Sequence, residues 1–303
     1  MSAALVPTPT ITDSDLPALF QAADKAAIRA QNHSLMAVRL ALIFGVSGAV
    51  VSTLGAAAGK RELAIAATAL LALSLVATLA LRMLNWEKDW YGCRAIAESA
   101  KSVAWRFMTG ADPFSKSRPE PEAEHELTQS LSQILATGKP FAGRLGRHAG
   151  TAPVVSDRMR AVRMLAFQER TQIYVGQRIV QQRDWYSSHA TSNDRAYDLW
   201  FMAVLLAQLA ALISAGIFIA NDQFQVSLAP LCSAAASALW AWLQAKHFRE
   251  LASAYGLTAI ELGLIEGRAR SVGSDQELAA FVSDAENAIS REHTMWVARR
   301  AGG

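Results

Sequence analysis

Four long runs of apolar residues constrain this chain more than any other feature of its sequence. They pair around two short turns, residues 59–62 and 221–224, and cover residues 40–58, 63–81, 199–220 and 226–243. A helix of about 19 residues crosses a hydrocarbon core roughly 30 Å thick. Only a helix or a closed barrel can cross, because lipid satisfies no backbone N–H or C=O group. The runs therefore predict two transmembrane helical hairpins, with four spans in total.

The remaining sequence has the composition of solvated helices. The 303 residues are 52% hydrophobic and only 18% charged, whereas a soluble domain is about a quarter charged. Outside the runs the chain is rich in Arg, Glu, Gln and Ser. We therefore expect an all-α membrane protein with long cytosolic helical extensions. The net charge of +3 is too small to favour nucleic acid, and no basic tract carries interleaved aromatics.

The distribution of Lys and Arg predicts the orientation. The hairpin turns carry only Lys60 and Arg61. The flanking segments carry many more, including Arg82, Lys88, Arg94, Lys101, Arg106, Arg183, Arg195, Lys246 and Arg249. Because cytosolic flanks are enriched in these residues, both termini and the middle segment should be cytosolic. The polar, Pro-rich stretch 1–15 has no signal-peptide pattern.

The helix of the second run is expected to continue out of the membrane. A heptad seam follows it, at Trp86, Trp90, Cys93, Ala97, Ala100, Ala104 and Phe107. This seam should pack on another helix, and the expected partner is the one over residues 157–185. The helix should end at Gly110-Ala111-Asp112-Pro113, because Gly favours the C-cap and Pro cannot continue a helix.

The other long helices are predicted from caps and periodicity. The first helix should begin near residue 15 and run unbroken into the first span. Ser156 should cap a helix that passes Trp185 and reaches the third span with a bend at 191–193. The helix of the fourth span should continue out of the membrane to about Glu266. A capping box at Ser274 should open a last helix, which buries Leu278, Phe281, Ala285, Ile289 and Trp296.

The two halves share a short motif as well as their order of helices. Tyr91-Gly92-x-x-Ala95-Ile96 recurs as Tyr255-Gly256-x-x-Ala259-Ile260, with Glu98 and Glu261 close behind. The common offset indicates a tandem duplication. The predicted organisation begins with a disordered tail (residues 1–14) and a first two-span domain (15–137). A Gly- and Pro-rich linker (138–155) then leads to a second two-span domain (156–303).

These motifs resemble a known family. The run from Trp90 to Phe114 is similar to bacterial SLATT domains, the two-transmembrane effector domains associated with SMODS nucleotidyltransferases and SLOG sensors. Three segments of the second half resemble a sister subtype of the SLATT domain, at residues 181–186, 255–261 and 286–296. The resemblance implies an effector of the bacterial cytoplasmic (inner) membrane that acts in conflict, stress or antiviral defence systems. Such an effector is silent until a nucleotide-linked signal triggers pore formation or membrane damage. The sequence contains no nucleotidyltransferase or sensor domain, so a sensor protein or a diffusible ligand is the expected trigger.

Enzymatic chemistry is not predicted. The sequence has no P-loop, GxSxG, HExxH or CxxC motif, and His125-Glu126 lies in a polar segment. Cys93 and Cys232 are isolated, so neither zinc nor a disulfide is expected. We therefore expect no catalytic, cofactor or metal residues. The candidate cytosolic motif comprises Trp90, Tyr91, Arg94, Glu98, Lys101, Trp105, Tyr255 and Glu261.

Small residues recur at helical spacing inside the spans, where no acidic residue occurs. Missing carboxylates argue against a proton- or sodium-coupled carrier. The stripes allow close helix packing, either within one chain or around a weakly polar pore in a homo-oligomer. The candidate residues are Gln208, Gly48, Ser52, Ser233 and Ser237. The sequence thus favours a pore-forming or membrane-perturbing effector, and the alternative is a non-conducting anchor or scaffold whose cytosolic helices bind a partner.

Overall fold

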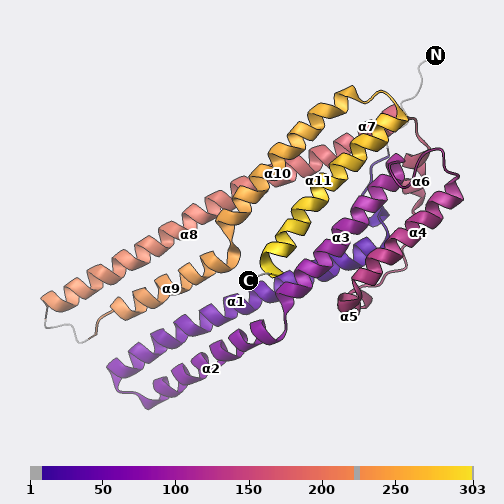
Figure 1. Cartoon of the computed structure of the whole chain (residues 1–303). Coiled ribbons are helices and arrows are strands. Elements are labelled where there is room, and N and C mark those ends of the chain that lie inside the picture. The colour runs from indigo at the N-terminus through magenta and orange to yellow at the C-terminus, as the bar shows by residue number, and fades with distance from the viewer. Residues whose placement is uncertain (1–8, 222–225, 302–303) are drawn as a thin grey trace. The chain divides into compact units, whose positions relative to one another are not determined.

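The computed structural model describes residues 9–221 and 226–301, with side chains described as far as Ser290. Within these residues the chain is helical and has no strands (Figure 1). The first eight residues of the predicted tail, most of the second turn and the Trp296 side chain lie outside the described part. Ile11, within the predicted tail, donates its backbone N–H to Gln177 Oε1 at 2.8 Å.

The helices form two compact units that do not follow the order of the chain. Unit 1 contains residues 1–31, 87–187 and 257–303, and unit 2 contains residues 32–86 and 188–256. Unit 2 therefore collects all four apolar runs, and unit 1 collects the polar segments from both halves of the sequence.

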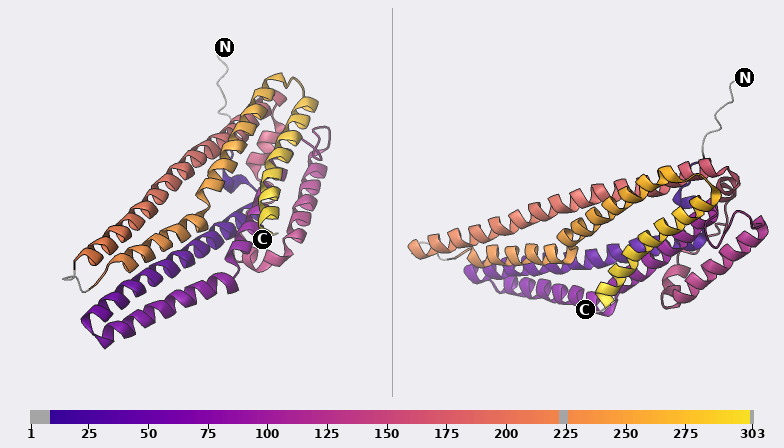
Figure 2. Two further views of the ribbon diagram at one scale, coloured as in Figure 1. Left: turned by 60° about the vertical axis from the view of Figure 1, so that its left-hand side comes forward. Right: turned by 45° about the horizontal axis from the view of Figure 1, so that its top comes forward.

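In unit 2, the C-terminal part of α1 (Ala18–Ala58) packs along α2 (Arg61–Met83). Gly59 makes the turn with φ +61°, a left-handed backbone conformation that favours glycine. Ser74 Oγ donates to the Ala41 carbonyl at 2.8 Å, and Gly48 lies against Leu71. Both views of Figure 2 show these antiparallel helices side by side.

The second pair in unit 2 is α8 (Gln181–Ala220) with α9 (Ala229–Lys246). Val204 of α8 and Leu243 of α9 are buried in one cluster with Phe248. The rings of Trp200 and Trp242 meet edge to face at 6.3 Å between centroids. These contacts align the two helices along much of their length.

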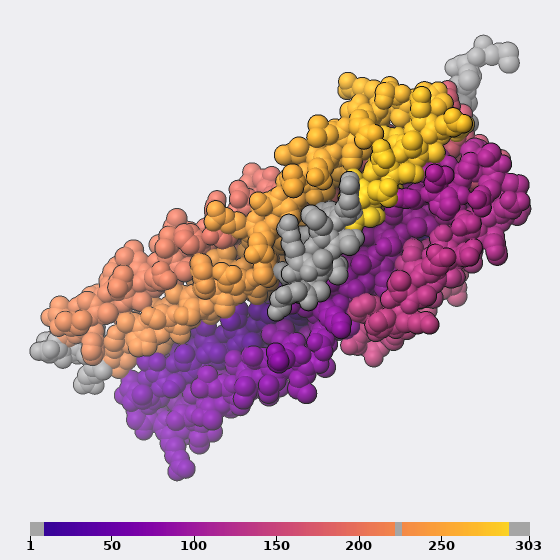
Figure 3. Space-filling model, viewed as in Figure 1, coloured from indigo at the N-terminus to yellow at the C-terminus, as the bar shows by residue number. Residues whose placement is uncertain are grey.

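Three helical stretches are long and apolar enough to cross a membrane, namely Ala18–Ala58, Arg61–Thr109 and Phe167–Ala220. Only 6–11% of their most apolar windows is buried within the chain, so these windows mostly face outward. Figure 3 shows α2 at an outer face of unit 2. The helix α9, which covers most of the predicted fourth span, is not among the three, because its 18 residues include Gln244, Lys246 and two Trp.

Unit 1 contains α3, most of which lies in this unit, together with the shorter helices, the C-terminal part of α10 and all of α11. The bounds are Trp86–Thr109 (α3), Glu120–Thr137 (α4), Ala142–Gly146 (α5), Asp157–Met164 (α6), Phe167–Tyr174 (α7), Phe248–Arg268 (α10) and Asp275–Ala301 (α11). Short 3-10 turns occupy Asp13–Asp15 (η1), Lys139–Phe141 (η2) and Ala269–Ser271 (η4), and η3, Val175–Val180, is a π-helical turn.

The predicted heptad seam is largely confirmed. Its residues Cys93, Ala97, Ala100, Ala104 and Phe107 are fully buried, whereas Trp86 and Trp90 are half-buried. The seam-bearing helix contacts the predicted partner region, because the rings of Trp105 and Tyr174 meet edge to face at 5.7 Å. Small residues in the middle of α3 allow neighbouring helices to approach closely.

Three predictions of continuous helices were wrong. The helix that Ser156 caps stops at Met164, restarts at Phe167 and has a π-helical turn before α8, whereas α8 itself is uninterrupted through residues 191–193. The second run does not continue directly into α3, because Asn85 takes φ +48°. His247, with φ +50°, likewise separates α9 from α10. Left-handed backbone at one residue ends the regular hydrogen bonding of a helix, and periodicity alone does not reveal it.

Candidate functional site

A network of buried charges lies in unit 1 and joins helices from both halves of the sequence. At its centre the Arg178 guanidinium donates to both carboxylate oxygens of Glu286, at 3.0 and 2.9 Å. The Tyr174 hydroxyl donates to Glu286 Oε1 at 2.9 Å. The Arg178 side chain is 1% exposed and that of Glu286 0%, so both charges lie away from solvent.

The network continues to the helices of the first half. Arg178 Nη1 lies 4.0 Å from Glu98 Oε2, and Glu98 Oε1 pairs with Arg94 Nη2 at 2.7 Å. Arg94 also donates to Asp24 of α1 at 2.9 Å. We refer to Asp24, Arg94, Glu98, Tyr174, Arg178 and Glu286 as the buried charge network.

Burial sets the protonation of these groups. Burial and the neighbouring Glu286 raise the pKa of Tyr174 well above its usual value, so the phenol remains a donor. Burial alone lowers the pKa of the Arg178 guanidinium, but the attraction of Glu286 outweighs it and the net pKa is raised. Burial also raises the pKa of Asp24, although Arg94 partly offsets this effect. The Arg178–Glu286 pair is therefore strong and costly to break, whereas Arg94 and Asp24, whose side chains are 40% and 23% exposed, lie at the solvent-facing end of the network.

A second group of cations holds the loop that follows α3. Arg163 Nη1 donates to the carbonyls of Phe107 and Phe114, at 2.7 and 2.9 Å, and its Nη2 donates to the Ser115 carbonyl at 3.0 Å. Arg170 donates to the Thr109 carbonyl and pairs with Asp275. Burial and nearby Arg170 lower the pKa of Arg163. Arg163 thus joins the end of α3 to the loop that follows it, and Arg170 joins the last residue of α3 to Asp275 at the start of α11.

Sequence reasoning missed the most buried of these groups. The sequence patterns do not predict four of them as site residues, namely Tyr174, Arg163, Arg170 and Arg178. They include Glu286 only within a segment that resembles the family. A signal was nevertheless present, because the three arginines are interspersed in the sequence with the buried apolar residues Met159, Val162 and Ile173. An Arg on an apolar stripe indicates a buried polar contact.

The structure brings together only part of the predicted cytosolic motif. Arg94 and Glu98 belong to the network, and Trp105 contacts its Tyr174. Lys101 pairs with Asp13 at 3.1 Å and lies over the Phe20 ring, and Trp90 stacks on Tyr91. Tyr255 is half-buried and belongs to unit 2, and Glu261 is exposed on α10.

The predicted span residues differ in exposure. Gly48 is buried, and a Cβ there would lie 3.0 Å from Leu71, so it permits the contact between α1 and α2. Ser52, Gln208, Ser233 and Ser237 are exposed on the surface of the single chain.

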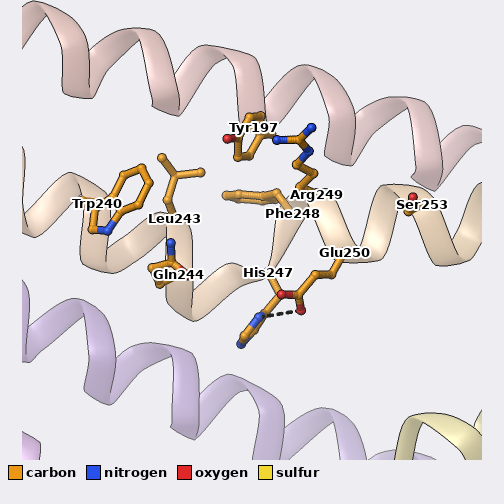
Figure 4. Close-up of a pocket in the computed structure, with 9 residues that line it drawn as sticks. All are labelled: Tyr197, Trp240, Leu243, Gln244, His247, Phe248, Arg249, Glu250 and Ser253. Carbon is orange, nitrogen blue, oxygen red and sulfur yellow. Dashed lines mark ion pairs between the residues drawn. The ribbon is translucent and has the colours of Figure 1, made fainter. Parts of the chain in front are cut away.

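A pocket of about 410 Å³ lies at the break between α9 and α10 (Figure 4). Arg249 lies over the Tyr197 ring of α8 at 5.6 Å from its centroid. His247 points away from α8 and pairs with Glu250 at 2.9 Å. Among the residues that the structure describes, no group of three or more His, Cys, Asp or Glu could hold a metal ion, and His125 is exposed.

Comparison with protein families accounts for both halves of the chain. Residues 17–171 match the SMODS and SLOG-associating 2TM effector domain 3, and residues 174–296 match the SMODS and SLOG-associating 2TM effector domain 1. No curated protein and no solved structure matches the chain. The buried charge network joins Asp24, Arg94 and Glu98 of the first match to Tyr174, Arg178 and Glu286 of the second. The resemblance noted from the sequence is confirmed, and the chain belongs to the SLATT family of two-transmembrane effector domains, with two such domains in tandem.

Proposed function

We propose that this tandem SLATT protein is a four-span effector of the bacterial cytoplasmic membrane that assembles into a homo-oligomer and forms a pore or otherwise perturbs the bilayer. Its membership of an effector family associated with conflict systems supports an effector role. The outward-facing apolar windows of its long helices support a bilayer as its surroundings.

The fourth span is assigned to α9 by its pairing with α8. The two helices share the cluster of Val204 and Leu243, so a membrane that contains α8 at this level also surrounds α9. Trp240, Trp242 and Lys246 near the C-terminal end of α9 are typical of a membrane boundary. The concentration of Lys and Arg outside the turns supports a cytosolic location for both termini and unit 1 in this proposal.

The observation that carries the pore proposal is the exposure of polar side chains on apolar helices. Gln208 on α8 and Ser237 on α9 face outward from the single chain. An amide in lipid has no hydrogen-bond partner, which is costly. A second copy of the chain, or water in a pore between copies, satisfies it. Gln208 is therefore proposed to face a subunit contact or the pore, with Ser52, Ser233 and Ser237 as smaller polar contributors.

The trigger is proposed to act on unit 1. The buried charge network holds helices of both domains in one arrangement there, and breaking a buried pair is costly. A nucleotide-linked signal or a sensor protein that binds a different arrangement shifts the population toward it.

The alternative is a non-conducting scaffold, and one observation favours it. Leu257, Ile260 and Leu264 are 60%, 65% and 70% exposed and form a row along α10. Their spacing of three and four residues matches a helix-docking face. A scaffold would use this face to dock a helix of a partner protein.

Induced expression with a membrane-potential dye distinguishes these functions. The effector depolarises cells when it is overproduced, and the scaffold leaves the potential intact. Ser237→Leu adds apolar volume and favours insertion, so lost toxicity in this variant indicates blocked helix approach and not failed insertion. Ala235→Leu is the matched control for added volume, because residue 235 lies on the same helix and is half-buried.

A further inference from the structure

Two cations from different hairpins meet at one aromatic ring in unit 2. The Arg39 guanidinium of α1 lies 5.2 Å from the centroid of the Trp242 ring, and Lys246 Nζ of α9 lies 5.9 Å from it. Lys246 also lies 5.5 Å from the Phe248 centroid. Aromatic rings attract cations through their electron-rich faces, but they carry no net charge.

No carboxylate neutralises this pair among the residues that the structure describes. The nearby Glu250 pairs instead with His247 at 2.9 Å, and the neighbouring Arg249 stacks on Tyr197. Arg39 and Lys246 thus repel each other beside the Trp242 ring, and no carboxylate among the described residues neutralises them. Arg39 is exposed, so this positive site is open to an anion from outside the chain.

The indole of Trp242 adds a third donor. Its Nε1 is buried and has no hydrogen-bond acceptor among the described residues. Buried N–H groups are nearly always satisfied, so each exception needs an explanation. An oxygen-bearing anion is the kind of acceptor that this N–H lacks.

The position of the three residues identifies the anion. Arg39 immediately precedes the first predicted span, and Lys246 lies three residues after the end of the fourth. In the proposed topology both lie at the cytosolic boundary of the bilayer, where lipid phosphates are concentrated and where Trp, Lys and Arg are typical.

We propose that Arg39, Trp242 and Lys246 form a binding site for the phosphate group of an anionic phospholipid, which bridges the two hairpins. The inference rests on the proposed four-span topology. A bound phosphate neutralises the repulsion between Arg39 and Lys246 and ties the span of the first SLATT domain to that of the second. The lipid is therefore a structural ligand of the tandem arrangement.

Thermal unfolding in detergent with added lipid tests the site. Phosphatidylglycerol is expected to raise the melting temperature of the wild-type protein by several degrees relative to phosphatidylcholine, and inorganic phosphate is expected to have little effect. The double variant Arg39→Gln, Lys246→Gln should lose this difference. The matched control is Lys60→Gln, Arg61→Gln, which removes the same charge at the exposed hairpin turn and should keep it.

Three results would overturn the proposal. Equal stabilisation by both lipids would remove the requirement for an anionic headgroup. If phosphatidylglycerol stabilises the double variant as much as the wild type, the lipid binds elsewhere. If inorganic phosphate stabilises the wild type as much as phosphatidylglycerol does, the site binds free phosphate. Native mass spectrometry, which counts retained phosphatidylglycerol, gives a readout that does not depend on stability. Cysteine labelling tests the topology separately, so failure of the lipid site is distinguishable from failure of the four-span arrangement.

Discussion

Arg178 and Glu286 form a two-point ion pair in which both side chains are almost completely buried. Removing one partner of such a pair leaves an uncompensated buried charge, which typically costs about 3–5 kcal/mol. Glu286→Gln is therefore expected to lower the thermal stability of the detergent-solubilised protein strongly, as measured by circular dichroism.

Asp284→Asn is the matched control for this substitution. Asp284 lies two residues away on the same helix and pairs with Arg268 at 3.0 Å, but both side chains are about 60% exposed. Exposed pairs contribute about 0–1 kcal/mol, so this variant should melt close to the wild type. Similar losses in the two variants would show that the network is not a dominant source of stability.

The repeated Tyr-Gly motif offers a second pair of substitutions. A Cβ at Gly92 would clash with the Phe141 ring, whereas nothing lies within 4 Å of one at Gly256. Gly92→Ala should destabilise by about 1–3 kcal/mol through overpacking. Gly256→Ala should stabilise by about 0.5–1 kcal/mol, because alanine favours a helix interior. Thermal melts of the two variants should therefore move in opposite directions, and a Gly92→Ala protein that melts at or above the wild-type temperature contradicts the packing described at Gly92.

Cys93 should be unreactive in the folded protein. It is completely buried, and burial with the nearby Asp89 raises its pKa to about 11, from 9.0 for an ordinary thiol. The folded state thus favours the protonated thiol, and this contribution is complete below pH 9.0 and is lost as the pH rises through about 11. In a Cys232→Ser background, maleimide should label Cys93 slowly at neutral pH and rapidly in denaturant. Rapid labelling without denaturant would mean that α3 opens readily.

The proposed topology predicts opposite accessibilities for the first turn and the middle segment. In a chain without its native cysteines, Lys60→Cys should react with an impermeant reagent added outside intact cells, and Arg118→Cys should react only after lysis. Reaction of position 118 but not 60 would reverse the orientation.

The sequence was most informative where one physical requirement dominated. Apolar length predicted the helices that run through residues 40–58, 63–81 and 199–220, and the period of seven predicted the buried small residues of α3. The breaks at Asn85 and His247 were missed because each depends on the left-handed backbone of one residue and leaves the apolar period intact. The charge network was only partly predicted, because Arg178 and Glu286 are 108 residues apart and only the tertiary fold brings them together.

The most direct test of the central claim is dye release from liposomes that contain the purified protein. We predict that the wild type releases a small trapped dye increasingly steeply as the protein-to-lipid ratio rises, because assembly precedes pore formation. Gln208→Leu should change this release while the protein remains inserted, since the substitution removes the exposed amide of α8. An inserted wild-type protein that releases no dye at any ratio would contradict the pore proposal and support the scaffold.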